Sequence, residues 1–575
     1  MFLKSIMKLK YNYFLFSIFL MIGWILPISF LPWTRMHQEV AAVLSLFILL
    51  ISLNNKKEYY FSIPLVGSFV IAWIPIIQFA IGVLLYFGDA IESFIYFFLF
   101  GLSVFIGSNI RDNSNNSIDF CKILSIVFII GSLVSFLIAM LQWTGLANGV
   151  DISWIMPIRG SRPYANLGQP NNLATLFGFG LAGVFYLFEQ NKIRNYFALI
   201  LALLLIFGLA LTQSRTPWVV AAILPFFWLW QSHRMPLRTT ARHVLLLVGV
   251  YVGFVLMLPV LGSFLEAPVS SVLERATQAH RWDMYKQALY FIAHGPWYGF
   301  GWGQIPLAHS LLSAQAPEAI FYHYSHNIVL DILLWNGPWI GGIIVVLFSA
   351  WLGTLFFQKN TVKSLFAWLG LLFFLIHSML EYPYAYLFLL LPAGLLLGIV
   401  EGQHRSREFE ISAPKNSIAI IAIIGLAVTV AFWNNYLIIE SDYREATRKM
   451  EENFIPEEVQ AVSQAILLDE LKETVYFSRF PLKSGYSEDL LERVDVFANR
   501  FPRKFSLVKS CYIFSLNGRQ EKAITQLIKL KDIFGISALE EALSYLYQES
   551  EKTPELLPVL AHFGLVKKAP AAVSD

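Results

Sequence analysis

The sequence predicts an all-α membrane protein that crosses the bilayer many times, and three observations support this fold class. Hydrophobic side chains make up 57% of the 575 residues and charged ones only 14%, which is far from the composition of soluble domains. Apolar segments long enough to span a bilayer recur as far as residue 437. Lys and Arg concentrate in alternate connectors, as the positive-inside rule requires.

We expect about thirteen transmembrane segments along residues 1–437. They are predicted near 12–33, 38–53, 61–86, 89–110, 121–144, 170–188, 195–213, 216–231, 243–262, 327–357, 361–380, 384–401 and 416–437. The first segment follows Lys4, Lys8 and Lys10 as a signal peptide would, but it is long and lacks a small-residue cleavage site. We therefore interpret it as a retained signal anchor.

The charges of the connectors predict the orientation. With the N-terminus inside the cell, every connector expected on the cytoplasmic side contains basic residues. These connectors are NNKKE (54–58), RDNSNNSIDFCK (111–122), NKIR (191–194), SHRMPLRTTARH (232–243), QKNTVK (358–363) and HRSREFEISAPK (404–415). The long loop 263–326 and the tail after residue 437 then lie outside.

The tail differs in composition from the membrane region. In residues 438–575, charges alternate with apolar residues at helical spacing, which predicts a soluble helical domain. A helix, the turn NGRQEKA and a second helix resemble a tetratricopeptide-like hairpin. Such a domain could hold an acceptor protein beside the membrane; a solubilising tail without a partner is the alternative. Cys121 and Cys511 fall on opposite sides of the membrane, so no disulfide is expected.

Five polar stretches are predicted on the outer face. They are SRPYANLGQPNNLATL (161–176), LTQSRTPW (211–218), the loop portion 271–304, YHYSHNIVLDILLWNG (322–337) and HSMLEYPY (377–384). Ionisable groups at membrane depth are costly and usually mark a function. Structural explanations exist for single residues: Arg215 could end a span, and Glu381 with Tyr382 could form an interfacial turn.

The same alternative applies to the start of the sixth span. Gln169, Asn171 and Asn172 could cap that helix without any further role. These explanations weaken because all five stretches share one face.

The loop portion suggests a ligand. Residues 271–293 have the apolar spacing of a helix, which a helix lying on the membrane surface explains. Its polar side contains Arg275, His280 and Arg281, and the following HGPWYGFGWG combines glycines with aromatics. Arginine matches phosphate oxygens, histidine accepts a hydroxyl proton near neutral pH, and aromatic faces suit sugar rings. These residue types predict a site for a lipid-linked diphosphate sugar.

Several of these stretches resemble a known superfamily. Arg281-Trp282, GPWYGFGWG and SHNIVLDILLWNGPWIGG are similar to signatures of the O-antigen ligase and polymerase (Wzy/WaaL) superfamily. Within it, ANLGQPNNLAT (165–175) and HSMLEYPYAYLFLLLPAG (377–394) resemble bacterial PglL-type protein O-oligosaccharyltransferases. The resemblance covers roughly residues 10–435.

The resemblance implies an activity and its partners. Such enzymes lie in the bacterial inner membrane and transfer an oligosaccharide from undecaprenyl diphosphate to a Ser or Thr hydroxyl of a periplasmic protein such as pilin. They use no nucleotide sugar, metal or other cofactor, and no nucleic acid. The membrane region would then be the transferase, with its catalytic motif in the periplasmic loop 263–326 and a periplasmic domain after residue 437.

The resemblance also implies residue roles. The essential histidine corresponds to His326, and the essential arginines correspond to Arg215 and Arg281. We expect His326 to activate the acceptor hydroxyl and the arginines, with Arg275, to bind the donor diphosphate. Asn327 is expected to cap the next helix or to orient the imidazole. The other active-site candidates are Gln169, Asn171, Asn172, His377, Glu381 and Tyr382, and Tyr384 and Tyr386 compete with Tyr382 for the family's tyrosine.

Alternative functions remain open at this point. An O-antigen ligase or polymerase would act on the same kind of donor. A transporter of lipid-linked glycans would need charges through the membrane midplane, whereas the predicted spans carry almost none away from their ends. A metal pair of His323 and His326 is the further alternative, but no nearby Asp or Glu completes it.

Overall fold

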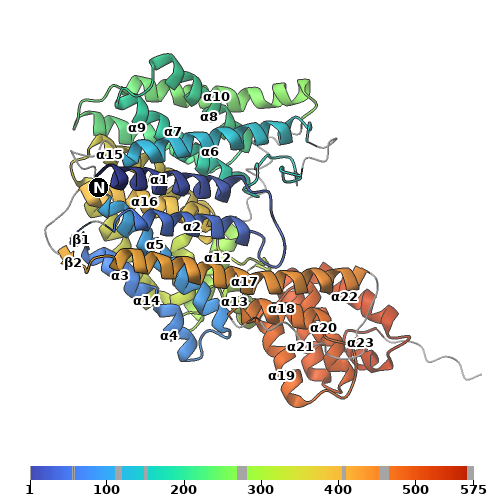
Figure 1. Ribbon diagram of the computed structural model, residues 1–575. Coiled ribbons are helices and arrows are strands. Elements are labelled where there is room, and N and C mark those ends of the chain that lie inside the picture. The colour runs from blue at the N-terminus through green and yellow to red at the C-terminus, as the bar shows by residue number, and fades with distance from the viewer. Residues whose placement is uncertain are drawn as a thin grey trace, which may run out of the picture.

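The structure is a computed structural model that describes most of the chain. The described residues are 2–54, 56, 58–110, 119–147, 153–158, 160–267, 281–316, 318–403, 410–451, 465 and 467–565. Helices dominate these residues, and they run side by side in one large bundle with a smaller helical group at one end (Figure 1). The all-α fold class is therefore confirmed.

Nine stretches of the described residues are long and apolar enough to cross a membrane. They are α3 with α4 (Ile63–Ile71 and Ile74–Ala80), α5 (Phe87–Asn109), α6 (Phe120–Trp143), α7 (Pro170–Glu189), α8 (Asn195–Thr212), α10 (Ala241–Phe264), α14 (Ile328–Phe357), α15 (Val362–Leu380) and α17 (Ser417–Glu451). The remaining helices of the bundle are α1 (Phe2–Ile25), α2 (Met36–Ile51), α9 (Thr216–Ser232) and α16 (Leu387–Gln403). The protein is a multi-pass membrane protein, and the number of thirteen crossings stays a prediction.

Three of the predicted segments differ from the helices observed. The first, predicted at 12–33, is the helix Phe2–Ile25, which ends eight residues earlier. The segment 61–86 is divided into α3 and α4, and Pro75 stands in the first turn of α4, where its missing N–H costs no helical hydrogen bond. The segment predicted to end at residue 437 continues as helix to Glu451. The apolar segment ends where charged residues begin, but Glu, Arg, Ala and Lys are strong helix formers. The helix therefore continues beyond the apolar segment.

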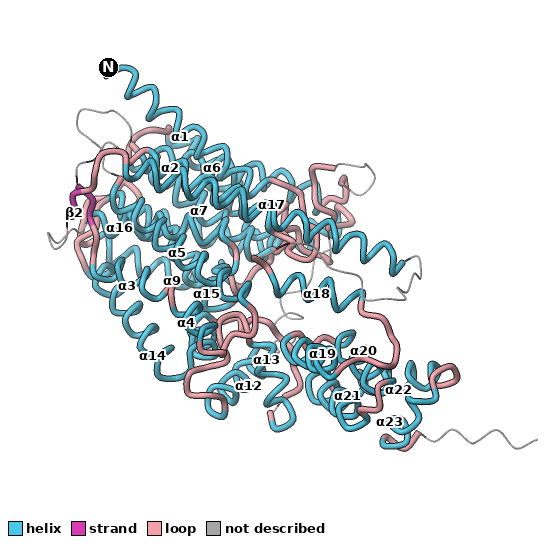
Figure 2. The backbone as a smooth tube through the Cα atoms, turned by 60° about the horizontal axis from the view of Figure 1, so that its bottom comes forward, coloured by secondary structure: helices cyan, strands magenta, loops and turns pink. Residues whose placement is uncertain are grey.

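The two ends of the bundle differ in what they carry. At one end, β1 (Glu58–Tyr60) pairs antiparallel with β2 (Glu410–Ser412), which joins two connectors predicted to be cytoplasmic. At the other end, the chain forms α12 (Arg281–His294), α13 (Ile305–Leu312), η1 (Ser313–Gln315) and η2 (Pro383–Ala385). Figure 2 shows α12 and α13 beside the C-terminal helices. The starts of α7, α9 and α14 and the end of α15 lie at this same end.

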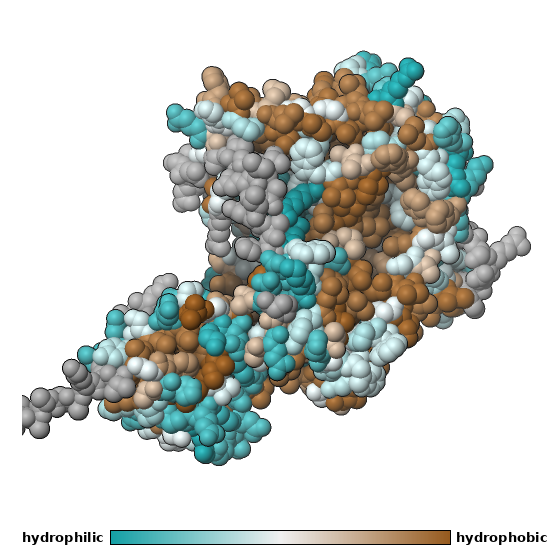
Figure 3. Space-filling view, turned by 180° about the vertical axis from the view of Figure 1, so that it is seen from behind, coloured by the Kyte–Doolittle hydropathy of each residue, from teal (hydrophilic) through white to brown (hydrophobic). Residues whose placement is uncertain are grey.

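The C-terminal helices enclose their own hydrophobic core. They are α18 (Asp469–Arg479), α19 (Glu488–Arg500), α20 (Lys504–Leu516), α21 (Gln520–Phe534), α22 (Ile536–Glu549), η3 (Pro554–Leu556) and α23 (Leu557–His562). On the face shown in Figure 3, hydrophobic residues cover most of the bundle and hydrophilic residues are frequent on these helices. The hairpin predicted around NGRQEKA is present as α20 and α21, while its tetratricopeptide character stays a prediction. Cys121 and Cys511 are both free and buried.

Buried polar contacts join the C-terminal helices to the bundle. Arg500 forms a two-point ion pair with Asp89 on α5, with distances of 2.7 and 2.9 Å. Asp469 accepts hydrogen bonds from the backbone N–H groups of Phe87 and Gly88, at 3.1 and 2.6 Å. The domain boundary predicted after residue 437 falls inside α17, so the division into two domains stays a prediction.

The predicted orientation can be tested with single cysteines. In a Cys121→Ser, Cys511→Ser background, we expect cysteines at exposed Trp297 and Tyr545 to react with an impermeant maleimide from the periplasm. Cysteines at Lys192 and His233 should react only after the inner membrane is permeabilised, because basic connectors are retained in the cytoplasm. Labelling of position 297 only after permeabilisation would contradict the prediction that the polar stretches face outward.

Candidate active site

Glu381 connects three of the predicted site residues. It follows the last residue of α15 and is only 5% exposed. One carboxylate oxygen pairs with the Arg281 guanidinium, and the other lies 2.5 Å from Nδ1 of His326. The side-chain amide of Gln169 lies 3.5 Å from the same carboxylate, the long limit of a hydrogen bond. Segments separated by more than 200 residues thus meet at one carboxylate.

The surroundings of Glu381 keep its carboxyl group ionised. Burial raises the pKa of Glu381, but the contact with His326 and the charges of His326 and Arg281 lower it, and the net pKa lies below the usual value. The close His326 contact lacks the alignment of a regular hydrogen bond, and it becomes an ion pair when the imidazole is protonated. A carboxylate beside Nδ1 favours a proton on that nitrogen, which leaves Nε2 as the basic atom for a substrate.

The backbone at His326 is held in a conformation that few side chains adopt. Its φ is +61°, in the left-handed region. The preceding residue, Ser325, donates its backbone N–H to Asp331 Oδ1 at 2.7 Å and its hydroxyl to the Asn327 carbonyl at 3.1 Å. Asn327 is the N-cap of α14, where its side chain accepts the N–H groups of the first turn. This is one of the two roles predicted for Asn327.

The three competing tyrosines have different contacts. The ring of Tyr382 packs edge-on against His326, with centroids 5.0 Å apart. The Tyr384 hydroxyl donates a hydrogen bond to Asp331, and Tyr386 stacks on Tyr382 at 6.0 Å. Of the three rings, Tyr382 is the one in contact with the imidazole, whereas Tyr384 acts on the histidine loop through Asp331.

Three arginines lie within the electrostatic influence of Glu381. Burial, followed by the charge of Arg281, lowers the pKa of Arg215 at the start of α9. Burial also lowers the pKa of Arg162; the attraction of Glu381 opposes this change, and the repulsion of Arg215 and Arg281 adds to it. The charge of Glu381 thus acts on three guanidinium groups, of which Arg281 is in contact with it, and a cluster of arginines favours an anion. Arg275 lies outside the described residues.

The start of α7 and the end of α15 provide further polar groups. Gln169 occupies the N-cap position of α7, but its side chain makes no capping hydrogen bond and points to Glu381 instead. Asn171 and Asn172 are buried in the first turn, and both amide atoms of Asn172 have no hydrogen-bond partner among the described residues. His377 Nδ1 lies 2.7 Å from the Thr175 hydroxyl, and its Nε2 is buried without a partner in the described part of the chain.

The glycine-rich stretch after α12 has a structural role. Pro338 kinks α14 and has no N–H for the Leu334 carbonyl, and the Phe300 N–H bonds to that carbonyl at 2.9 Å. At Gly299, a Cβ atom would lie within 2.6 Å of the α14 backbone. These glycines therefore bring backbone to α14, which differs from the predicted approach of backbone to a ligand.

His323 does not join the site. Its ring packs edge-on against Phe321, with centroids 5.0 Å apart. In the described ranges, no group of three or more His, Cys, Asp or Glu side chains has the arrangement of a metal site. The predicted alternative of a His323–His326 metal pair therefore has no third ligand in these ranges.

Sequence reasoning missed two residues of this arrangement. Arg162 stands in a stretch that was recognised as polar, but only the fold brings it to Arg215 and Glu381. Asp331 is the one acidic residue in the apolar run after His326, and an acidic residue in such a run was the available signal in the sequence. The structure shows that its side chain is fully buried.

The role assigned to Glu381 leads to a mutational prediction. Glu381→Gln keeps the shape but leaves Arg281 and His326 without their countercharge, and we expect kcat to fall by about 10²-fold or more. Glu381→Asp, which keeps the charge, should retain part of the activity. The measurement is initial-rate kinetics of glycan transfer across a pH series.

A matched control removes a carboxylate on α12, the helix that begins with Arg281. Asp283 forms an exposed ion pair with Lys286 on α12, so Asp283→Asn should leave the rate nearly unchanged. Equal effects of Glu381→Gln and Asp283→Asn would exclude a role for Glu381 in the site.

Two family models and two characterised proteins are similar to this chain. A family model described as O-Antigen ligase matches residues 200–346, and one described as virulence factor membrane-bound polymerase, C-terminal, matches residues 365–542. The general O-oligosaccharyltransferase of Acinetobacter baylyi is 28% identical over 527 residues, which cover 89% of this chain and 91% of the relative. The ComP-specific O-oligosaccharyltransferase of the same organism is 30% identical over 448 residues, 76% of this chain and 80% of the relative.

The multi-pass helical fold, with a histidine and arginines gathered at one end, defines a membrane-embedded glycosyltransferase of the O-antigen ligase superfamily. The extent and identity of the matches specify the branch. The chain belongs to the bacterial O-oligosaccharyltransferase family, the PglL-type members of that superfamily.

Proposed function

We propose that this enzyme transfers a preassembled oligosaccharide en bloc from undecaprenyl diphosphate to Ser or Thr hydroxyls of periplasmic acceptor proteins such as pilin. The observation that carries the proposal is the meeting of His326 and Arg281 at Glu381. In this proposal His326 is the base and Arg281 a cation that binds the diphosphate, and their shared contact with Glu381 supports both roles. The two Acinetobacter relatives, both named O-oligosaccharyltransferases, support a protein acceptor.

The proposed reaction is a single displacement. Nε2 of His326 takes the proton of the acceptor hydroxyl while the hydroxyl oxygen forms a bond to the anomeric carbon. The bond from that carbon to the diphosphate oxygen breaks, and undecaprenyl diphosphate leaves with the bonding electron pair. Direct displacement inverts the anomeric centre, and the imidazolium that forms is stabilised by Glu381.

The arginines act on the leaving group. Arg281 uses part of its guanidinium to pair with Glu381, and its remaining N–H groups, with Arg215 and Arg162, bind the diphosphate oxygens. Their positive charge offsets the negative charge that develops on the leaving diphosphate. The stacked rings of Tyr382 and Tyr324, whose centroids are 4.8 Å apart, offer an aromatic surface for the first sugar.

The proposal includes a location. The basic connectors at the β1–β2 end would lie in the cytoplasm and the candidate site in the periplasm, with the bundle in the inner membrane. A lipid-linked donor would then reach the site from the outer leaflet, while a folded acceptor approaches from the periplasm.

An O-antigen ligase or polymerase is the second candidate, because the O-Antigen ligase model matches residues 200–346. In vitro transfer distinguishes the candidates. Purified protein would be mixed with undecaprenyl diphosphate-linked oligosaccharide and one of three acceptors: a pilin with a second periplasmic protein, lipid A-core, or donor alone. We expect glycan only on protein, detected by intact mass. Glycan on lipid A-core would indicate a ligase, lengthened donor a polymerase, and no transfer at all would favour a transporter.

A further inference from the structure

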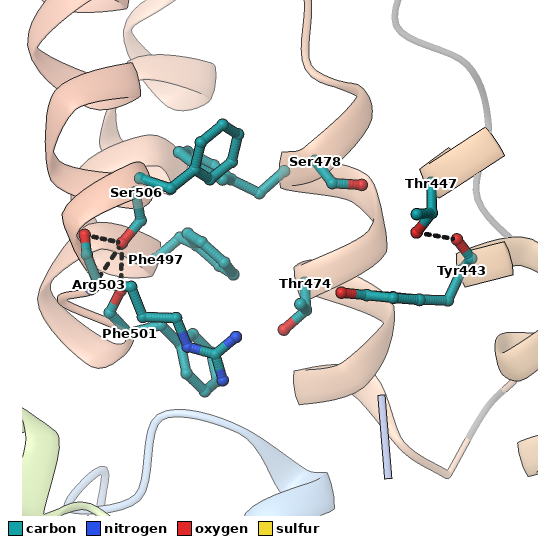
Figure 4. A pocket seen from close by; sticks show the side chains of 10 residues that line it. Tyr443, Thr447, Thr474, Ser478, Phe497, Phe501, Arg503 and Ser506 are labelled. Atoms are coloured by element: carbon teal, nitrogen blue, oxygen red, sulfur yellow. Dashed lines mark hydrogen bonds between the residues drawn. The ribbon is translucent and has the colours of Figure 1, made fainter. Parts of the chain in front are cut away.

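A cavity lies between the end of α17 and the C-terminal helices, outside the candidate active site. Its volume is about 220 Å³, and α18, α19 and α20 supply most of its wall. Phe497 and Phe501 lie on one side of the cavity, and Tyr443 and Thr474 lie on the other (Figure 4). Phe477 also lines the cavity. This combination can hold an apolar side chain and still bond to a polar group beside it.

Arg503 places a positive charge at the cavity. In Figure 4 its side chain points toward α18, the helix that carries Thr474 and Ser478. Within the described residues, no carboxylate forms an ion pair with Arg503. The arginines around it differ, because Arg493, Arg500 and Arg519 each pair with a glutamate or aspartate.

The surroundings of Arg503 favour an added anion. Burial lowers the pKa of Arg503, the interaction with Tyr443 raises it, and the charge of Arg500 lowers it further. Arg503 is also the N-cap residue of α20. The partial positive charge at the start of this helix therefore adds to the positive electrostatic potential in the cavity. A carboxylate that entered here would supply Arg503 with a countercharge that no described carboxylate provides.

The cavity is connected to the loop that carries His326. The charge of Arg503, after burial, lowers the pKa of His323, which places the guanidinium within electrostatic reach of a residue three positions before His326. The same loop packs on the C-terminal helices through Phe321 and Phe534, whose ring centroids are 5.2 Å apart. A polypeptide bound in the cavity would therefore lie on the same helical group that packs against the loop before His326.

We propose that this cavity binds a segment of the acceptor protein in which a carboxylate stands next to an aromatic or large aliphatic side chain. The carboxylate pairs with Arg503, and the apolar side chain packs on the phenylalanine rings, at a distance from the hydroxyl that is glycosylated. This inference rests on the proposed transfer to protein. It assigns the C-terminal helices the role of raising the local concentration of acceptor at the active site.

Two synthetic peptides test the proposal with the full-length protein in detergent. Both contain the same Ser-containing segment and a flexible Gly-Ser linker; one ends in a segment with Glu and Phe, the other in a segment with Gln and Ala. Glycosylation is followed with undecaprenyl diphosphate-linked oligosaccharide, and binding without donor is followed by fluorescence anisotropy. We expect the Glu-Phe peptide to show a KM about tenfold lower at similar kcat.

The variants separate the cavity from the active site. Arg503→Gln should raise the KM for the Glu-Phe peptide about tenfold and leave the KM for the donor and the Gln-Ala peptide unchanged. Phe505→Ser, at the 57% exposed ring that also lines the cavity, should act in the same direction. Arg519→Gln is the matched control, because Arg519 loses only an exposed ion pair with Glu488 in the same helical group.

The outcomes are distinct. Equal KM values for the two peptides, or an Arg503→Gln variant that behaves like wild type, would overturn the cavity proposal while transfer itself persists. If neither labelled peptide binds, but short-chain phosphatidylglycerol binds in a way that depends on Arg503, the proposal is overturned and the cavity is a site for a lipid headgroup. Arg503-dependent peptide binding without glycosylation of any peptide would support the cavity and refute the proposed function.

Discussion

Arg281→Lys is expected to lose at least about 10²-fold in kcat/KM, although the substitution keeps the positive charge. The reason is geometric. Arg281 already pairs with Glu381, and only a planar guanidinium has further N–H groups in fixed directions for the donor diphosphate. A lysine ammonium pairs either with Glu381 or with phosphate, and it fixes neither in orientation.

The measurement for Arg281 is glycan transfer at several donor concentrations, with membrane insertion checked for each variant. Arg215→Ala should lose activity similarly if Arg215 also meets the diphosphate. Arg194, at the start of α8 on the β1–β2 end, provides the control, and Arg194→Lys should be close to wild type. Full activity in both Arg281→Lys and Arg281→Ala would show that Arg281 is an interfacial anchor only.

The fold class followed from the sequence because a bilayer imposes one dominant constraint. Apolar length and the side of Lys and Arg residues are local properties, so the helices could be predicted without knowing how they pack. The end of α17 could not, because hydropathy marks where the membrane ends and helix propensity decides where the helix ends. The predicted end at 437 and the observed end at Glu451 differ for this reason.

The membership of the candidate site was predicted better than its connections. His326, Arg281 and Glu381 were all named from residue type and position, but the carboxylate was considered only as an interfacial turn or a reserve candidate. Its contacts with Arg281 and His326 depend on how α12, α14 and α15 pack, and a single sequence carries no signal for such long-range pairs. The same limitation explains why Arg162 was missed.

Some residues gained a structural explanation in place of a functional one. The glycines of HGPWYGFGWG suggested a ligand, yet Gly299 packs closely on the kinked backbone of α14, and Phe300 and Gly301 donate hydrogen bonds to it. The reverse holds for Gln169, where a simple cap was a fair alternative and the side chain points to Glu381 instead. In both cases the residue type was compatible with a structural and a functional role, and only the group that the residue contacts in the fold decides between these roles.

His326→Ala is expected to lower turnover by about two to four orders of magnitude, the usual range for one general base. The imidazole has the features that this role requires: Nδ1 faces Glu381, and Ser325, Asp331 and Asn327 hold the backbone at its left-handed φ. Donor binding should persist, because Arg215 and Arg281 remain. The measurement is glycosylation of a purified acceptor together with donor binding, with membrane insertion checked.

The positioning of His326 provides the comparison that separates loss of the base from loss of the fold. Tyr384→Phe removes the hydrogen bond to Asp331 and leaves the imidazole in place, so it should lower kcat less than His326→Ala and shift no KM for the donor. His323→Ala should be mild, since its ring lies against Phe321 and away from Glu381. If a well-inserted His326→Ala protein transferred glycan at nearly the wild-type rate, the acceptor proton would have to go to another group. Glu381, the only carboxylate in contact with both His326 and Arg281 among the described residues, would then be the base.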